Sequence, residues 1–101
     1  MKMDMKEIKK ACLTGKIDLS DHAVQRMDKR GYIENDVVQC IMTGQIKERQ
    51  VYRGKPTVII AGEDLDGLPI IVAVGTSSKK NHYIVITVMP PIDKERFDRV
   101  I

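Results

Sequence analysis

The sequence predicts an α+β fold in which N-terminal helices pack on a four-stranded antiparallel sheet. Up to Gly44, apolar residues recur with the helical period of about 3.6, and from Gln45 onward they approach the period of about 2 typical of strands. The chain has 101 residues, of which 43% are hydrophobic and 31% charged. This is the size and composition of one globular domain, so we expect residues 1–101 to form a single domain.

Cap residues predict the first two helices. Asp4 is a suitable N-cap, and the first helix ends at Gly15. Ser20 is the expected N-cap of a second helix over residues 21–30, which Gly31 stops.

A third helix is predicted over residues 34–43. Ile33 stands where a Ser or Thr cap is usual, and we expect Glu34 and Asp36 to compensate through the helix dipole. Residues 17–19, which precede the second helix, are predicted to be a short extended link.

Strand-like segments follow, separated by turn signals. Asp66-Gly67 is a hairpin signal, and Pro90-Pro91 stops the last strand. Residues 93–100 are predicted to form a short final helix. The predicted strands cover residues 45–52, 57–63, 69–76 and 82–89.

The inner strands are almost continuously apolar, where a sheet with one wet face would alternate. The runs 58–61, 70–74 and 83–86 therefore predict a sheet that is buried on both faces. Because the helices cover one face, we expect a homodimer or the C-terminal segment to cover the other.

Charge and cysteine content exclude few function classes. The net charge of +3 permits nucleic-acid binding without requiring it. Cys12 and Cys40 are scattered, as are the two His, so no zinc site or other cofactor is predicted. No signal peptide or membrane span is evident, and we expect a cytoplasmic protein with free thiols.

One stripe of the second helix has the residue types of a phosphodiester site. His22, Arg26 and Arg30 are spaced i, i+4, i+8 and share one face. A His side chain can exchange a proton near neutral pH, and an Arg side chain can make a bidentate contact to a phosphate. The N-terminus of a helix also favours anions. We take these three residues as candidate catalytic residues and Lys29, on the same polar side, as an RNA contact. The alternative is an ordinary solvated helix face.

Two further segments are candidates. Tyr83 and Thr87 are predicted to share one face of the last strand, so that either side chain can donate a hydrogen bond to a phosphate. Thr87 is taken as a catalytic candidate and Tyr83 as an RNA contact; the alternative is that both are ordinary strand formers. Tyr52, Arg53 and Lys55 form a basic, aromatic turn that is a candidate contact to an RNA backbone or a stacked base; the alternative is an ordinary solvated turn.

A pattern of residues resembles a bacterial family of domains of unknown function. The resemblance covers roughly residues 19–91. The sequence departs from the family at Ile33, where a Ser or Thr cap is usual. The pattern consists of Ser20, His22, Ala23, Arg26, Met27, Arg30 and Gly31, then Asn35-Asp36-Val37, Thr43-Gly44, Gly54, Pro56, Gly67, Ile86-Thr87-Val88 and Pro90-Pro91.

That family is thought to be related to RelE/ParE-like and BrnT-like toxins. The resemblance implies a RelE/ParE-like fold, an RNA substrate (mRNA or ribosome-bound), and a small zinc-finger antitoxin as partner. It points to His22, Arg26, Arg30 and Thr87. We therefore expect a metal-independent endoribonuclease of a type II toxin–antitoxin pair. The alternatives are a non-catalytic module of the same fold that binds protein or RNA, an unrelated enzyme, or a structural role.

Overall fold

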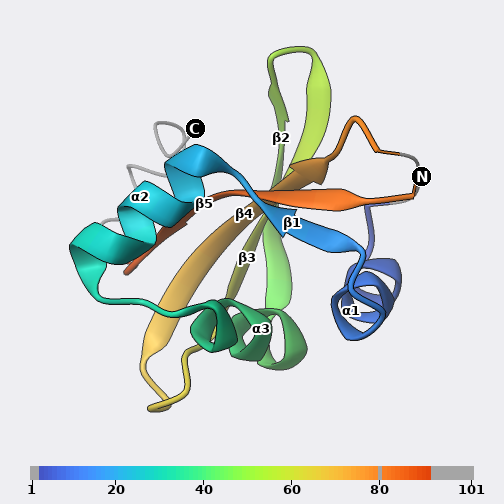
Figure 1. Ribbon diagram of the computed structural model, residues 1–101. Helices are drawn as coiled ribbons and strands as arrows, with labels where there is room; N and C mark the ends of the chain where they lie inside the picture. The colour runs from blue at the N-terminus through green and yellow to red at the C-terminus, as the bar shows by residue number, and fades with distance from the viewer. Residues whose placement is uncertain (1–2, 80, 92–101) are drawn as a thin grey trace.

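The computed structural model describes residues 3–79 and 81–91, which form an α+β fold of three helices and a five-stranded mixed sheet (Figure 1). The predicted helix over residues 93–100 lies outside the described residues. No helix in the described part of the chain is long and apolar enough to cross a membrane. In chain order, the elements are α1 (Met5–Leu13), β1 (Ile17–Leu19), α2 (Asp21–Arg30), α3 (Glu34–Thr43), β2 (Gln45–Tyr52), β3 (Lys55–Glu63), β4 (Pro69–Thr76) and β5 (Tyr83–Met89).

The sheet has the strand order β1-β5-β4-β3-β2. The prediction of four antiparallel strands was wrong in one respect, because residues 17–19 form a fifth strand rather than a link. β1 runs parallel to β5, with Ile17 opposite Tyr83 and Leu19 opposite Val85. The other neighbouring strands are antiparallel. Pairing with β1 satisfies backbone groups on a stretch of β5 that would otherwise be a free sheet edge.

The predicted caps fix the bounds of α2. The Ser20 hydroxyl accepts a hydrogen bond from the Ala23 amide at 3.0 Å, and Gly31 ends the helix in the left-handed conformation at φ 77°. At α3, Ile33 provides no side-chain cap. Instead the Asp36 carboxylate accepts from the Ile33 amide and from the Leu65 amide, each at 3.0 Å. Asp36 thus acts through direct hydrogen bonds as well as through the helix dipole.

Both faces of the sheet are apolar, as the continuous runs predicted. On the face that packs against the helices, Ile60 and Val72 are fully buried. On the opposite face, Ile59 and Ala73 form a second buried cluster with their neighbours. α2 lies alongside β5, at one side of the molecule (Figure 1).

A β-bulge in β5 changes which residues share a face. Val74 pairs with Val85 while Ala73 pairs with Thr87, so Ile86 is an extra residue. Where two residues of one strand lie opposite one residue of its neighbour, every later side chain of the bulged strand changes to the other face of the sheet. The prediction that Tyr83 and Thr87 share a face was therefore wrong. Tyr83 packs in the core under the helices, whereas Thr87 lies on the opposite face of the sheet.

Candidate functional site

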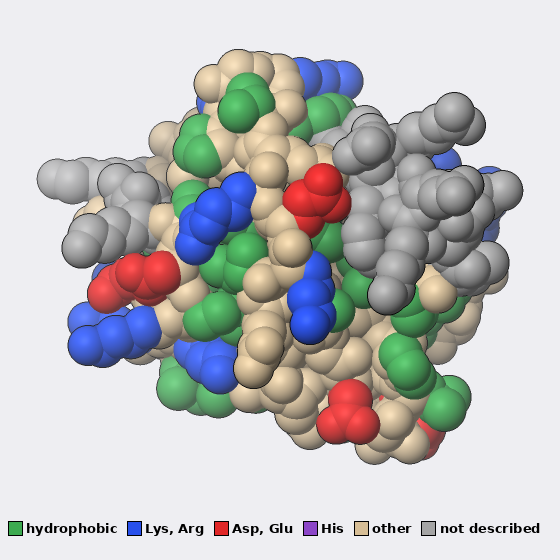
Figure 2. Space-filling model, turned by 180° about the vertical axis from the view of Figure 1, so that it is seen from behind, with side chains coloured by type: hydrophobic (Ala, Val, Ile, Leu, Met, Phe, Trp, Pro, Cys, Tyr) green, Lys and Arg blue, Asp and Glu red, His purple; other side chains and the backbone are tan. Residues whose placement is uncertain are grey.

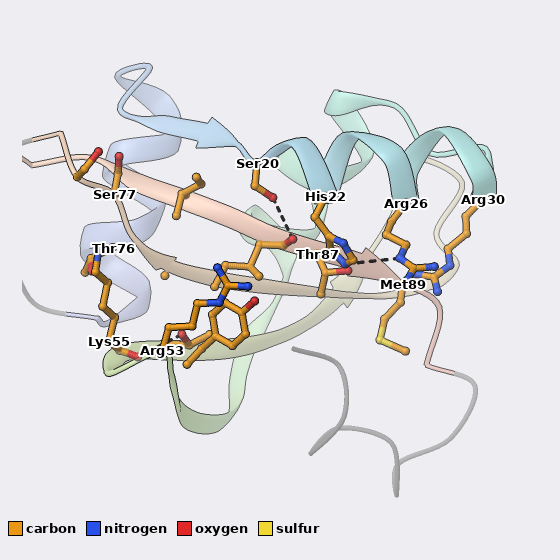
Figure 3. Close-up of a pocket in the computed structure, with 16 residues that line it drawn as sticks. Ser20, His22, Arg26, Arg30, Arg53, Lys55, Thr76, Ser77, Thr87 and Met89 are labelled. Atoms are coloured by element: carbon orange, nitrogen blue, oxygen red, sulfur yellow. Dashed lines mark hydrogen bonds between the residues drawn. The ribbon is translucent and has the colours of Figure 1, made fainter.

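A groove of about 1030 Å³ lies between α2, the β2–β3 turn and the sheet face opposite α3 (Figure 3). Residues from three separate parts of the chain form its walls and floor. They are Ser20, His22, Arg26 and Arg30 from α2 and its cap, Tyr52, Arg53, Lys55 and Thr57 from the hairpin, and Gly75, Thr76, Ser77, Ser78, Ile84, Ile86, Thr87 and Met89 from β4, β5 and their connection.

The α2 wall brings the predicted stripe into the groove. His22, Arg26 and Arg30 point from the helix toward the space beside Thr87 and Met89 (Figure 3). Arg26 Nε donates a long hydrogen bond of 3.5 Å to His22 Nε2. To accept it, the imidazole must be neutral and carry its proton on Nδ1. In this arrangement the His22 ring lies next to a fixed positive charge.

Hydrogen bonds from α2 and its cap hold the helix against the outer edge of β5. β1 ends at Leu19, and beyond it the Ser20 amide donates to Val85 O and the Ser20 hydroxyl to Ile86 O, both at 3.0 Å. One turn after Arg26, Arg30 Nη1 donates to Val88 O at 2.6 Å. These bonds connect α2 and its cap to carbonyls along β5, and they fix the direction in which the α2 stripe faces. Arg30 therefore positions the helix, whatever else its guanidinium contacts.

The opposite wall is the tight turn between β2 and β3. Tyr52 pairs with Lys55, which leaves Arg53 and Gly54 as a two-residue loop with φ of 52° and 78°. Positive φ at both positions is what a type I′ hairpin turn requires. The Arg53 guanidinium carbon lies 5.2 Å from the centroid of the Tyr52 ring, within cation–π range. Arg53 and Lys55 reach the groove from this turn (Figure 3).

The groove is electropositive. Arg26, Arg30, Arg53 and Lys55 line it, and the described lining includes no Asp or Glu. Seen from behind, the molecule shows lysine and arginine side chains scattered among apolar, polar and acidic ones (Figure 2). Cations converging on one cleft focus the field and attract anions. The groove can therefore hold a polyanion such as a nucleic-acid backbone.

The structure brings together seven of the nine residues that the sequence singled out. Besides His22, Arg26 and Arg30, these are Thr87, Tyr52, Arg53 and Lys55. Thr87 is only 3% exposed, so it offers the floor a small polar surface.

Lys29 and Tyr83 lie elsewhere. Lys29 is exposed on α2 but does not line the groove, and Tyr83 is 3% exposed within the helix-side core. Burial, then the nearby Glu7 and Asp4, raises the pKa of the Tyr83 hydroxyl.

Sequence reasoning missed the hydroxyl groups and the apolar floor. Ile84, Ile86 and Met89 form apolar parts of the lining, and Thr57, Thr76, Ser77 and Ser78 add hydroxyls. The position of the hydroxyl residues could have been predicted from the order of the antiparallel strands. The start of β3 must lie beside the end of β4, as Thr57 does beside Gly75. The β4–β5 connection therefore had to lie near the basic turn.

Other reactive side chains lie away from the groove. His82 Nδ1 is 3.5 Å from Asp18 Oδ2, and Lys79 Nζ is 3.7 Å from the same oxygen. Burial raises the pKa of the Cys40 thiol to about 12, so this thiol is neutral at physiological pH. The described residues contain no group of three or more His, Cys, Asp or Glu arranged to hold a metal ion.

Comparison with models of protein families finds a match for this chain. The family model described as "Domain of unknown function (DUF4258)" matches residues 19–90. No curated protein and no solved structure matches the chain. The matched segment begins just before the Ser20 cap and ends after β5, so it includes every element that lines the groove.

Proposed function

This chain belongs to the family Domain of unknown function (DUF4258), and we propose that it is an endoribonuclease that cuts RNA in the groove without a metal ion. The observation that supports this proposal is the convergence of His22, Arg26 and Arg30 with two further cations in one cleft. A proton-transfer group beside fixed cations is the minimum that phosphodiester transfer needs from side chains.

The proposed reaction is an internal transfer within RNA. The 2′-oxygen attacks the adjacent phosphorus, a P–O2′ bond forms and the P–O5′ bond breaks. The products are a 2′,3′-cyclic phosphate and a 5′-hydroxyl. His22 Nε2 accepts the proton of the 2′-hydroxyl, and the substrate takes the place of the long 3.5 Å contact that Arg26 Nε makes with this nitrogen. Water protonates the leaving 5′-oxygen, because the groove lining within the described part of the chain includes no second histidine.

Arg26 and Arg30 have different roles in the proposed reaction. Arg26 is half-buried, next to His22, and none of its recorded hydrogen bonds goes to the backbone, so it is the main contact for the phosphorane oxygens. Arg30 uses Nη1 to hold Val88 O, and its remaining N–H groups are left for the phosphate. Thr87, on the floor, contributes its hydroxyl to the same site.

The biological role we propose is that of the toxin in a type II toxin–antitoxin pair. The sequence resemblance to RelE/ParE-like and BrnT-like toxins supports it. The substrate is then mRNA, free or ribosome-bound, and the inhibitory partner is a small zinc-finger protein. We also propose a homodimer, on the basis of the continuous apolar runs of the inner strands, formed through a surface that leaves the groove open.

The test is induced expression in a bacterial host, followed by mapping of new RNA ends. We expect growth arrest and cleavage from the wild-type chain, with cleavage lowered about 10²–10⁴-fold by His22→Ala, as for loss of a general base. Lys29→Ala is the matched control, because Lys29 is exposed on the same helix but outside the groove. Cleavage should persist in EDTA. Full toxicity of both His22→Ala and Arg26→Ala would contradict the assignment.

A second candidate is a non-catalytic module that uses the same groove to bind RNA. One observation favours it: His22 is exposed, and its side-chain contact within the described chain is to Arg26, with no carboxylate orienting the ring. In this case folded wild-type protein binds RNA without cutting it. Each cation then contributes to affinity and no single residue is essential.

A further inference from the structure

The β2–β3 turn, which forms the groove wall opposite α2, has a residue type at its first central position that is unfavourable for the backbone conformation there. Type I′ turns prefer Asn, Asp or Gly at both central positions, because φ is positive there. Here the first position is Arg53, at φ 52°. Side chains kept in a disfavoured conformation are often functional, and this one reaches the groove.

Arg53 is also paired with an aromatic ring. Its guanidinium carbon lies 5.2 Å from the Tyr52 centroid, and both residues line the groove. An arginine plane beside an aromatic ring is a surface on which a nucleobase can stack. Lys55, exposed two residues later, places a second cation there for a phosphate.

The floor between the two walls favours an unpaired strand. Ile84 and Ile86 give it an apolar surface, and Ser77, at one side, supplies a hydroxyl. Bases splayed from a single strand can lie on apolar or aromatic surfaces, whereas those of a duplex are stacked inside it. A volume of about 1030 Å³ is at the upper limit of pockets for one drug-sized ligand, so it accommodates more than one nucleotide.

We propose that Tyr52, Arg53 and Lys55 form a second nucleotide subsite, so that the groove binds single-stranded RNA across its whole width. The phosphate to be cut lies at the α2 wall, and a neighbouring base stacks at the hairpin turn. This inference rests on the proposed function, because it takes RNA to be the groove's ligand. It adds that the hairpin determines both the single-strand preference and much of the affinity.

The test measures binding of a labelled octanucleotide RNA whose 2′-hydroxyls are methylated, so that it cannot be cut, and of a duplex of the same length. The informative variant is Arg53→Asn, which suits the positive φ and removes the guanidinium. Lys47→Gln is the matched control, since Lys47 is exposed on β2 outside the groove. Both variants should unfold at or above the wild-type temperature.

We expect the single strand to bind more tightly than the duplex. Arg53→Asn should weaken single-strand binding by at least about 5-fold, the lower end of what a stacked base contributes. It should also lower the salt slope by about 1, whereas Lys47→Gln changes neither.

Equal binding of the single strand by wild type and Arg53→Asn, with wild-type cleavage intact, overturns the subsite and leaves the proposed function standing. Failure of the wild-type protein to bind either RNA overturns both proposals.

Discussion

Replacing Ser20 by alanine should loosen α2 from the sheet. The hydroxyl makes two bonds: it accepts from the Ala23 amide, as N-cap of α2, and donates to the carbonyl of Ile86 in the bulge, each at 3.0 Å. Loss of an N-cap costs about 1 kcal/mol. Loss of the donor to this part-buried carbonyl costs about 1 kcal/mol more. We therefore expect Ser20→Ala to lower the free energy of unfolding by about 2 kcal/mol, which in a domain of this size lowers Tm by roughly 8–16 °C.

Two further substitutions separate these bonds. Ser20→Thr keeps a hydroxyl that accepts and donates, and it should stay close to wild type. Ser20→Asp keeps the cap acceptor but cannot donate to Ile86 O, so it should lose at least about 1 kcal/mol. Urea unfolding followed by circular dichroism measures all three variants. A Ser20→Ala variant within about 0.5 kcal/mol of wild type, the usual range for surface substitutions, would refute the reasoning.

Two predictions concern the core. A Cβ on Gly62 would lie 2.3 Å from Cys40 O and 3.0 Å from the Cα of Gly44, so Gly62→Ala should lower the free energy of unfolding by about 2 kcal/mol or more in a urea titration. Gly75→Ala, whose Cβ meets a movable side-chain tip at 3.0 Å, should lose less. The Cys40 thiol has a folded pKa of about 12, raised by burial from the usual 9.0, so its contribution to stability is complete below pH 9 and decreases as pH rises from 9 toward 12. Over that range the urea midpoint of wild type should fall more steeply than that of Cys40→Ala, and parallel slopes would contradict the assigned pKa.

Local signals in the sequence were sufficient to predict the helices. Ser20 and Gly31 act at the two ends of α2 as predicted, and the i, i+4, i+8 spacing places His22 and Arg26 on one wall. Burial on this helix was harder to predict, since Val24 is apolar and yet 42% exposed, whereas the preceding Ala23 is fully buried. Helical periodicity assigns a side of a helix, but only the contacts made by the sheet determine how much of that side is covered.

Long-range pairing was not visible in the sequence. Residues 17–19 are too few to show a strand period, and they become β1 only because Tyr83 and Val85 lie beside them in β5. The predicted end of β2, just before the Arg53-Gly54 turn, was confirmed. The predicted start of β3 was wrong, because β3 begins at Lys55, which the sequence placed in the turn. A two-residue turn requires both flanking residues to pair, and the sequence pattern did not reveal this requirement.

The bulge at Ile86 links the fold to the candidate site more closely than any other feature. Regular alternation would have placed Thr87 in the core with Val85, and the extra residue moves it to the groove floor. The same irregular segment offers the Ile86 carbonyl to the Ser20 hydroxyl, which fixes the first turn of α2. Since His22 lies in that turn, one inserted residue in β5 positions both the helix wall and the floor that it faces. Bulges commonly re-aim side chains next to functional sites, and here the bulge and the helix cap act as one unit.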